Sequence, residues 1–246
     1  MRILLNGFSG RMGAAVLEVS ANGYLGSEVV AGVDLFPKEH DIPCYSSFSD
    51  VSEKADCIID FSNHESIKAV VDYAVVSGLP LVVSTTGHTE EEKEIIMKAA
   101  ESIPVFYSAN MSMGVALLCR MAILTAKTLP GADIEIIETH HNRKLDAPSG
   151  TALMILNAIK SVRENAKSVF GRHGMSKREA DDITVHAVRR GNIVGIHEVV
   201  VSTDYETITL KHEAHSRTLF AEGAIAAADF IIGKAPGLYE MSSLIG

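Results

Sequence analysis

The densest group of residues able to do chemistry is the stretch Glu138–Ala152, which reads ETHHNRKLDAPSGTA. Within five positions it places four side chains that can carry positive charge, namely His140, His141, Arg143 and Lys144. The whole chain is acidic, with 22 Lys and Arg against 31 Asp and Glu, so this local positive charge predicts a site for an anion. A histidine that titrates near neutral pH and a lysine tuned by its neighbours are both suitable proton donors beside that anion.

The end of the same stretch is typical of the beginning of a helix. Ser149 is a suitable N-cap, which leaves the backbone N–H groups of Gly150 and Thr151 available to a carboxylate. Two simpler interpretations compete: a basic loop that is only solvated, or a histidine pair that binds zinc. Side chains of adjacent residues such as His140 and His141 diverge, whereas metal-binding histidines are usually spaced i, i+4 or further apart, so we expect no metal site.

A second signal is the turn Gly7-Phe8-Ser9-Gly10-Arg11-Met12-Gly13, between an expected first strand and first helix. Glycines there allow a tight turn, close approach of backbone N–H groups to a pyrophosphate, and close packing of helix on strand. Asp34 follows the second expected strand, where an acid can accept hydrogen bonds from an adenosine ribose. The alternative is a glycine turn with a capping aspartate, but the strand context and the placed acid favour a dinucleotide site.

Two further segments follow expected parallel strands, at the sheet edge where such folds bind ligands. They are Ser84-Thr85-Thr86-Gly87 and Ser108-Ala109-Asn110-Met111. Small and hydroxyl-bearing residues there would let a nicotinamide ribose and ring lie against the backbone. Ordinary turn chemistry is the competing explanation.

Composition limits the class of protein. The chain has 246 residues, 47% hydrophobic and 22% charged, as in an ordinary globular protein. A formal net charge of -9 disfavours nucleic acid as a partner. The three cysteines are widely spaced, which favours reduced thiols. The first apolar run is too short for a signal peptide and no run reaches membrane-spanning length, so we expect a soluble cytoplasmic protein with no membrane partner.

Alternation of short apolar runs with helical patterns predicts a doubly wound parallel sheet in the first half. The expected strands are 2–5, 29–33, 57–60, 81–83 and 105–107, and the expected helices are 11–21, 65–77 and 90–100.

The second half has a different pattern, which predicts an α+β region with an open mixed or antiparallel sheet. Helices are expected over 114–129, 149–163 and 218–232, and strands over 133–138, 183–189, 196–202 and 207–212. The three last strands follow one another through short turns, which favours antiparallel neighbours. The charged segment 164–182 is expected to be mobile.

Taken together, these motifs resemble the 4-hydroxy-tetrahydrodipicolinate reductase (dihydrodipicolinate reductase) family. The resemblance covers nearly the whole chain in order, and the HHxxKxDAPSGTA pattern is far more specific than any glycine loop. The matching segments are GFSGRMG at 7–13, DFS at 60–62, STTG at 84–87, SANMSMGV at 108–115, ETHHNRKLDAPSGTA at 138–152, and the region from Ser216 to Ala224.

The resemblance implies a Rossmann-like dinucleotide-binding domain over 1–111 and 217–246, and a substrate-binding and oligomerisation domain over 112–216. It implies a homotetramer that reduces a cyclic imine dicarboxylate with NADH or NADPH, in diaminopimelate and lysine biosynthesis. His140 and Lys144 match the proposed proton donors, and His141, Gly150 and Thr151 match substrate contacts. The matching cofactor positions are Gly7, Phe8, Ser9, Gly10, Arg11, Met12, Asp34, Ser84, Thr85, Thr86, Ser108, Ala109, Asn110 and Met111.

Two departures and two alternatives remain open. Ser84 stands where the family often has Gly, and Leu35 and Phe36 follow Asp34 where some relatives carry Arg, so a strong NADPH preference is not expected. Another two-domain NAD(P)-dependent dehydrogenase of amino-acid metabolism is one alternative. Semialdehyde chemistry, however, needs a placed Cys nucleophile, and no cysteine lies in these motifs. A non-catalytic dinucleotide sensor is the other alternative, and it would not need the His-Lys loop.

Overall fold

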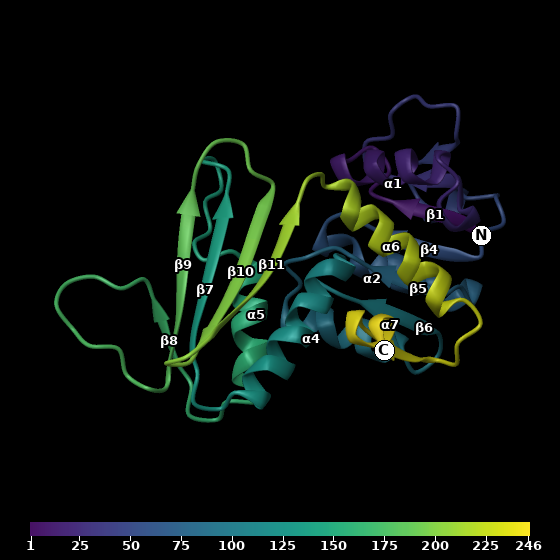
Figure 1. Cartoon of the computed structure of the whole chain (residues 1–246). Coiled ribbons are helices and arrows are strands. Elements are labelled where there is room, and N and C mark those ends of the chain that lie inside the picture. Colours follow the sequence, from purple (N-terminus) through teal and green to yellow (C-terminus); the bar gives the residue numbers. More distant parts are fainter. The chain divides into compact units, whose positions relative to one another are not determined.

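The computed structural model describes every residue from Met1 to Gly246. The chain forms two compact units: the first is Met1–Ser112 together with Arg217–Gly246, and the second is Met113–Ser216. Figure 1 shows the first unit in purple, blue and yellow and the second mainly in teal and green. No helix in the chain is both long and apolar enough to cross a membrane.

The first unit is built on a seven-stranded parallel sheet with the order β12-β6-β5-β4-β1-β2-β3. This order, with neighbouring strands on both sides of β1, confirms the predicted doubly wound Rossmann-like fold. The strands are β1 (Arg2–Asn6), β2 (Glu28–Val33), β3 (Cys44–Tyr45), β4 (Cys57–Asp60), β5 (Leu81–Val83), β6 (Pro104–Tyr107) and β12 (Gly237–Tyr239).

Helices cover both faces of this sheet. The helix α1 (Arg11–Ala21) packs beside α6 (Thr218–Ile231), and α2 (Ile67–Ser77) packs beside α3 (Glu90–Ala99). Consecutive β1 residues Ile3, Leu4 and Leu5 are all buried, as expected for a strand covered on both faces. The C-terminal segment adds β12, which pairs with β6, and a short helix α7 (Met241–Ile245).

The ends of these helices follow from local chemistry. The helix α3 begins with a capping box, in which Thr89 and Glu92 each accept a hydrogen bond from the other's backbone N–H. The helix α2 begins two residues later than expected, because Asn63 caps a separate 3₁₀ turn over His64–Ser66. Neither β12 nor α7 was predicted, since runs of three and five residues carry little periodicity.

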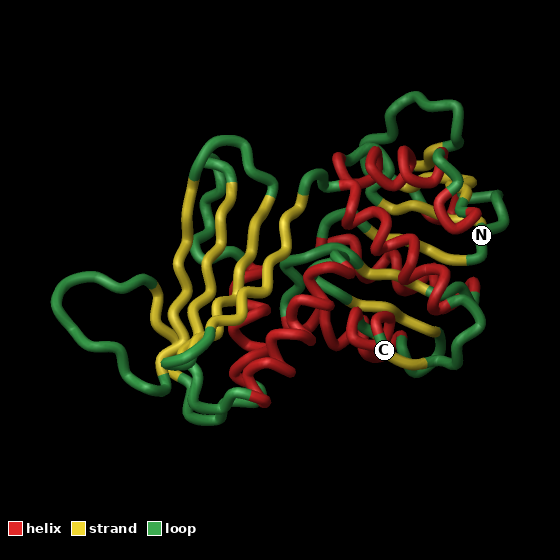
Figure 2. The backbone as a smooth tube through the Cα atoms, in the orientation of Figure 1, coloured by secondary structure: helices red, strands yellow, loops and turns green.

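The second unit is a five-stranded sheet with the order β11-β10-β7-β9-β8. The helices α4 (Met113–Thr128) and α5 (Gly150–Lys160) pack on one face of it, and Figure 2 shows them in red beside the yellow strands. The strands are β7 (Asp133–His140), β8 (Lys167–Phe170), β9 (Asp182–Arg189), β10 (Gly195–Ser202) and β11 (Thr207–Ala214). Ile134 and Ile136 of β7 are buried against the helices.

The sheet is mixed, so the expectation that the last three strands are antiparallel neighbours is wrong for β9 and β10. The strand β7 lies between them, parallel to β9 and antiparallel to β10. Both β7 and β10 contribute fully buried apolar residues to the core, among them Ile136 and Val199, so burial along the strands does not show which strand is central.

The charged segment 164–182 contains β8 (Lys167–Phe170), which was not predicted and is parallel to β9, and several of its charges are paired. Lys167 lies 2.7 Å from Glu179, Arg172 lies 3.0 Å from Asp182, and Arg178 bridges to Asp133 at 2.7 Å.

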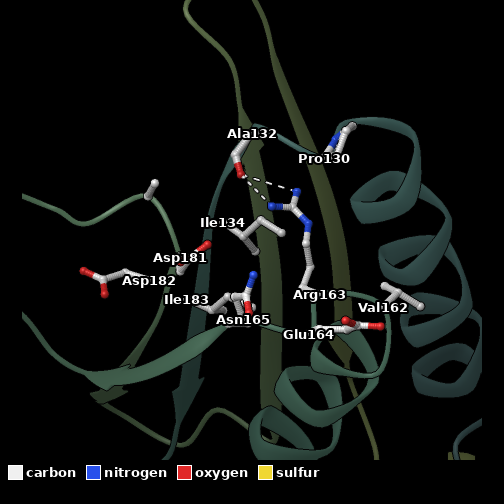
Figure 3. A pocket seen from close by; sticks show the side chains of 12 residues that line it. Pro130, Ala132, Ile134, Val162, Arg163, Glu164, Asn165, Asp181, Asp182 and Ile183 are labelled. Atoms are coloured by element: carbon white, nitrogen blue, oxygen red, sulfur yellow. Dashed lines mark hydrogen bonds between the residues drawn. The ribbon is translucent and has the colours of Figure 1, made fainter.

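Arg163 caps the C-terminal end of α4. Its guanidinium donates to the backbone carbonyl of Ala126, in the last turn of the helix, and to those of Leu129 and Ala132, in the turn that follows it. Arg163 lines a hollow of about 320 Å³. Figure 3 shows its side chain together with Asp181 and Asp182, which line another side. None of the residues expected to do chemistry lies in this hollow, so we assign it a structural role.

Candidate functional site

The glycine-rich turn after β1 has the shape that a pyrophosphate requires. Gly7 has φ +81°, and a Cβ on it would lie 2.5 Å from the Phe61 carbonyl oxygen. A Cβ on Gly13 would lie 2.3 Å from the Phe8 carbonyl oxygen. No side chain caps α1, and its first turn carries no acid, so the N–H groups of Arg11 and Met12 point out of the helix without an intrahelical acceptor. This helix terminus therefore fits a phosphate.

Phe8 and Ser9 of this turn are engaged within the chain. The Phe8 ring is buried under Gly32 and meets His40 edge-on. The Phe8 N–H donates to the Val33 carbonyl at 3.4 Å. Phe8 therefore shapes the turn from below, and neither its ring nor its N–H points into the proposed cofactor site.

Asp34 lies at the end of β2 beside a pocket of about 480 Å³ that also borders Gly7, Gly10 and Phe36. Its two carboxylate oxygens accept the N–H groups of Ser9 at 2.9 Å and Phe36 at 3.0 Å. Each oxygen keeps a second lone pair, so the carboxylate can still accept from a ribose. The side chains of Leu35 and Phe36 are 74% and 82% exposed and bring no charge to the pocket.

The two later loops meet at the same edge of the sheet. A second pocket, of about 430 Å³, is lined by Arg11 and Met12 together with Ser84, Thr85, Thr86, Ala109, Asn110 and Met111. The structure thus brings together the glycine turn and both loops expected to hold the nicotinamide end. Ser108 shapes the loop rather than lining the pocket, because its hydroxyl bonds to the backbone N–H and carbonyl of Asn110.

One buried acid beneath this edge was not predicted. Asp60 ends β4 with 0% exposure, and it accepts hydrogen bonds from Asn6 at 2.7 Å and the Ser62 hydroxyl at 2.5 Å. Its other oxygen has no hydrogen-bond partner. Burial raises the pKa of Asp60, although the hydrogen bonds from Ser62 and Asn6 oppose this. The sequence signal that could have identified Asp60 was its position at the end of an expected parallel strand.

In the second unit, His140 ends β7 and is held by Glu138 of the same strand. The Glu138 carboxylate has 0% exposure and lies 2.5 Å from Nδ1 of His140. It also accepts both Arg189 Nη groups at 2.8 Å and the Ser149 backbone N–H at 3.0 Å. Burial alone would raise the pKa of Glu138, but the hydrogen bonds from His140, Arg189 and Ser149 lower it to about 2.

His197 of β10 completes the buried part of this cluster. Its ring meets that of His140 edge-on, with centroids 5.2 Å apart, and its Nε2 lies 3.3 Å from the Ser149 hydroxyl. Burial and the nearby His140 lower the pKa of His197 to about 4. The Ser149 hydroxyl also accepts the Ala152 N–H, which confirms Ser149 as the N-cap of α5.

The remaining predicted residues lie around this cluster. Lys144 Nζ lies 2.9 Å from Asp146, and the hydrogen bond from Lys144 lowers the pKa of that carboxyl. Gly150 and Thr151 begin α5, and a Cβ on Gly150 would meet nothing within 4 Å, so the space beside this helix terminus is open. The His141 N–H donates to the Ile193 carbonyl at 2.8 Å, which fixes the loop after β7.

Glu138, Arg189 and His197 were not singled out from the sequence. All three side chains lie on the face of the sheet that packs against α5, since they share that face with Ile136, Val185 and Val199. The sequence signal that could have identified them was a polar side chain whose position in the strand alternation places it on the buried apolar face.

Comparison with known proteins matches both units of the chain to the two parts of one family. Residues 1–111 match the family description "Dihydrodipicolinate reductase, N-terminus", and residues 114–245 match "Dihydrodipicolinate reductase, C-terminus". The chain belongs to the dihydrodipicolinate reductase family. A relative from Caldanaerobacter subterraneus subsp. tengcongensis, named 4-hydroxy-tetrahydrodipicolinate reductase, is 45% identical over 100% of this chain and 98% of the relative. A relative of the same name from Clostridium novyi is 41% identical over 99% of this chain and 98% of its own length.

Solved structures agree with this family. A dipicolinate-bound dihydrodipicolinate reductase from Paenisporosarcina sp. TG-14 superposes with a TM-score of 0.83 at 25% identity, covering 98% of this chain and 97% of that one. Aspartate dehydrogenase from Thermotoga maritima, at 13% identity and a TM-score of 0.54, shares the fold alone. The resemblance inferred from the motifs is confirmed, and the chain is an oxidoreductase of the nicotinamide-dependent type.

Proposed function

We propose that this chain reduces (4S)-4-hydroxy-2,3,4,5-tetrahydrodipicolinate to tetrahydrodipicolinate, the reductase step of diaminopimelate and lysine biosynthesis. The observation that carries this proposal is the cluster at the end of β7. There a buried His140–Glu138 pair lies beside the N-terminus of α5, which is open to an anion. The substrate is a cyclic dicarboxylate, and a helix N-terminus flanked by His and Lys suits a carboxylate.

The first unit supplies the cofactor site in this proposal. The N–H groups of Arg11 and Met12 hold the pyrophosphate, and Asp34 accepts from the adenosine ribose. The segments Ser84–Thr86 and Ser108–Met111 form the nicotinamide side of the site. When bound, the nicotinamide supplies the hydride.

The second unit supplies the substrate site. Loss of water from the substrate gives a conjugated imine; the hydride then adds at a ring carbon, and a proton neutralises the negative charge that results. His140 or Lys144 donates that proton, and the positive charge of the loop stabilises the anion while it lasts. The N–H groups of Gly150 and Thr151, with His141, hold a carboxylate and so fix the ring orientation.

Two finer points belong to the same proposal. The carboxylate of Asp34 and the uncharged Leu35 and Phe36 favour dual use of NADH and NADPH, with NADH at least as good. A homotetramer is supported by the sheet of the second unit. Its face opposite α4 and α5 presents Ile137, Val188 and Val200, which no element of this unit covers. We place the enzyme in the cytoplasm.

One assay tests the activity directly. Freshly generated substrate is added to the purified chain with NADH under anaerobic conditions, and the nicotinamide absorbance is followed. Consumption of one NADH per substrate is expected. A non-catalytic dinucleotide sensor would bind NADH without turnover, and a different dehydrogenase would turn over only with another substrate.

A further inference from the structure

His140, one of the two proton donors proposed above, supplies one of four nitrogen atoms that converge on a single carboxylate, that of Glu138. The Glu138 oxygens receive His140 Nδ1, the Ser149 N–H and two Arg189 nitrogens, each between 2.5 and 3.0 Å. Arg189 also donates to the Asp146 carbonyl at 2.5 Å, and the Asp146 carboxylate pairs with Lys144. Glu138 is thus linked to both candidate donors and to the start of α5.

We propose that Glu138 is a positioning residue that fixes the tautomer of His140 and anchors the substrate-binding end of α5. This inference rests on the proposed function, because it identifies the ring nitrogen of His140 that would transfer the proton.

The tautomer follows from hydrogen-bond chemistry. A carboxylate that already accepts two Arg189 N–H groups and a backbone N–H is ionised, and an ionised carboxylate can only accept. Nδ1 of His140 must therefore carry a proton and donate it to Glu138. Nε2 is then the nitrogen that gains and loses the proton.

A glycine leaves open space beside Nε2 of His140. Gly195 of β10 faces the ring, and a Cβ there would lie 3.1 Å from Nε2 of His140 and 3.5 Å from its Cδ2. Any larger residue would crowd the nitrogen that we assign to proton transfer.

The anchoring role follows from the second carboxylate oxygen. The N–H of Ser149 precedes the N–H groups of Gly150 and Thr151, which are proposed to hold the substrate carboxylate. Because one Glu138 oxygen fixes His140 and the other fixes Ser149, a single rigid side chain sets the position of the proton donor relative to the anion site.

The first test is made on the wild-type protein, and a variant is needed only to assign the signals. Nitrogen-15 NMR of the histidine rings in the wild-type protein, assigned by loss of the His140 signals in His140→Gln, reports which nitrogen is protonated. We expect neutral His140 to be the Nδ1–H form, with and without pyridine-2,6-dicarboxylate. The Nε2–H form, which predominates for free histidine, would overturn the proposal whatever the activity of the enzyme.

The second test uses Glu138→Gln and a matched control, Glu135→Gln. Glu135 lies on the same strand and accepts from His186 at 2.8 Å, but it is on the opposite face of the sheet. We expect Glu138→Gln to move His140 to a mixture of tautomers, to lower kcat by roughly 10–10³-fold, and to weaken pyridine-2,6-dicarboxylate binding to the cofactor-free protein by calorimetry. Glu135→Gln should change none of these.

The outcomes separate the two proposals. If Glu138→Gln keeps the Nδ1–H form and wild-type kcat, the positioning role is wrong while the proposed reaction stands. If the wild-type protein does not turn over the substrate, the reaction is wrong, and the tautomer and the inhibitor calorimetry still decide the role of Glu138. If Glu138→Gln does not fold, Gly195→Ala takes its place. It should keep the Nδ1–H form and lower kcat, and an unchanged kcat would contradict the assignment of Nε2.

Discussion

The Asp34 carboxylate accepts a hydrogen bond of 2.9 Å from the backbone N–H of Ser9. This bond joins the end of β2 to the glycine-rich turn after β1, although the two residues are far apart in the chain. The acid expected to bind the ribose and the turn expected to bind the pyrophosphate therefore form one surface. A change at Asp34 would disturb both, so the cofactor preference is better tested at its neighbours.

NADH should bind at least as tightly as NADPH. Asp34 repels a 2′-phosphate, and Leu35 and Phe36 bring no positive charge to offset it. Titration of the purified protein with each cofactor gives the two Kd values. A preference for NADPH greater than about tenfold, roughly 1.4 kcal/mol, would contradict this prediction.

We expect the positive charge of Lys38 to reduce the repulsion between Asp34 and the 2′-phosphate of NADPH. Its Nζ donates to the Ser9 carbonyl at 3.1 Å, so it is held beside the turn. Lys38→Met should weaken NADPH binding several-fold more than NADH binding. Lys98→Met, in the last turn of α3, is the control and should affect neither.

Pyridine-2,6-dicarboxylate should inhibit competitively with substrate, because it has the ring and both carboxylates but cannot accept a hydride productively. Thr151→Val should raise KM more than it lowers kcat, since it removes a hydroxyl while keeping the shape of the side chain. Gly150→Ala should weaken the inhibitor about tenfold without lowering Tm, because the added methyl meets only open space within the chain.

Gly131→Ala is a matched control for the Gly150 substitution. A Cβ on Gly131 also meets nothing within 4 Å, but this residue lies in the turn before β7. It should leave inhibitor binding unchanged. Equal inhibition by pyridine-2-carboxylate, which has one carboxylate, would show that the two-carboxylate anchor is wrong.

His140→Gln and Lys144→Ala should each lower kcat by roughly 10²–10⁴-fold, the range for a lost acid catalyst, with NADH affinity nearly unchanged. The double variant should lose much less than the product of the single losses, because the residues act on the same proton transfer. Steady-state kinetics and NADH titration measure both effects. Near-wild-type kcat in both single variants would exclude both residues as the donor, and loss of NADH binding would assign the loop to the cofactor.

Local chemistry made much of the first unit predictable from the sequence. The helix α1 and the strands β4 and β5 have the expected bounds, because apolar runs there are delimited by glycine, proline or polar residues. The segments proposed to bind the cofactor could also be located from the sequence, since each follows the carboxyl end of a parallel strand.

Long-range pairing made the rest unpredictable. Glu138 and Arg189 meet only because β7 and β9 are parallel neighbours, and the sequence order favoured β10 as the neighbour of β9. The same error concealed Arg189, which holds the Glu138 carboxylate from the neighbouring strand. Alternation along β7 is enough to place Glu138 and His140 on one face, but the partner that fixes Glu138 depends on a strand pairing that no local pattern sets.

The last prediction concerns acid stability and His197. Burial and His140, His212 and Lys144 lower the pKa of His197 from its ordinary value of 6.5 to about 4, while Glu138 opposes them. The unfolded chain therefore takes up a proton on this residue at a pH where the folded chain does not. Stability should be complete above about pH 6.5 and should fall as the pH drops toward 4, by on the order of 3 kcal/mol. Burial also lowers the pKa of His212, which acts in the same direction.

His197→Gln removes this titration and retains a polar partner for the Ser149 hydroxyl, so its stability should depend less on pH between 6.5 and 4. Glu138 adds a separate loss at lower pH: its pKa is depressed from 4.5 to about 2, so its contribution is present above 4.5 and disappears as the pH falls through that range. Thermal unfolding midpoints at intervals from pH 7 to 4 measure the effect. His186→Gln, at a partly exposed ring on the opposite face of the sheet, is the control and should keep the wild-type slope. A slope in His197→Gln equal to that of the wild type would show that the buried histidine is not the source of the acid sensitivity.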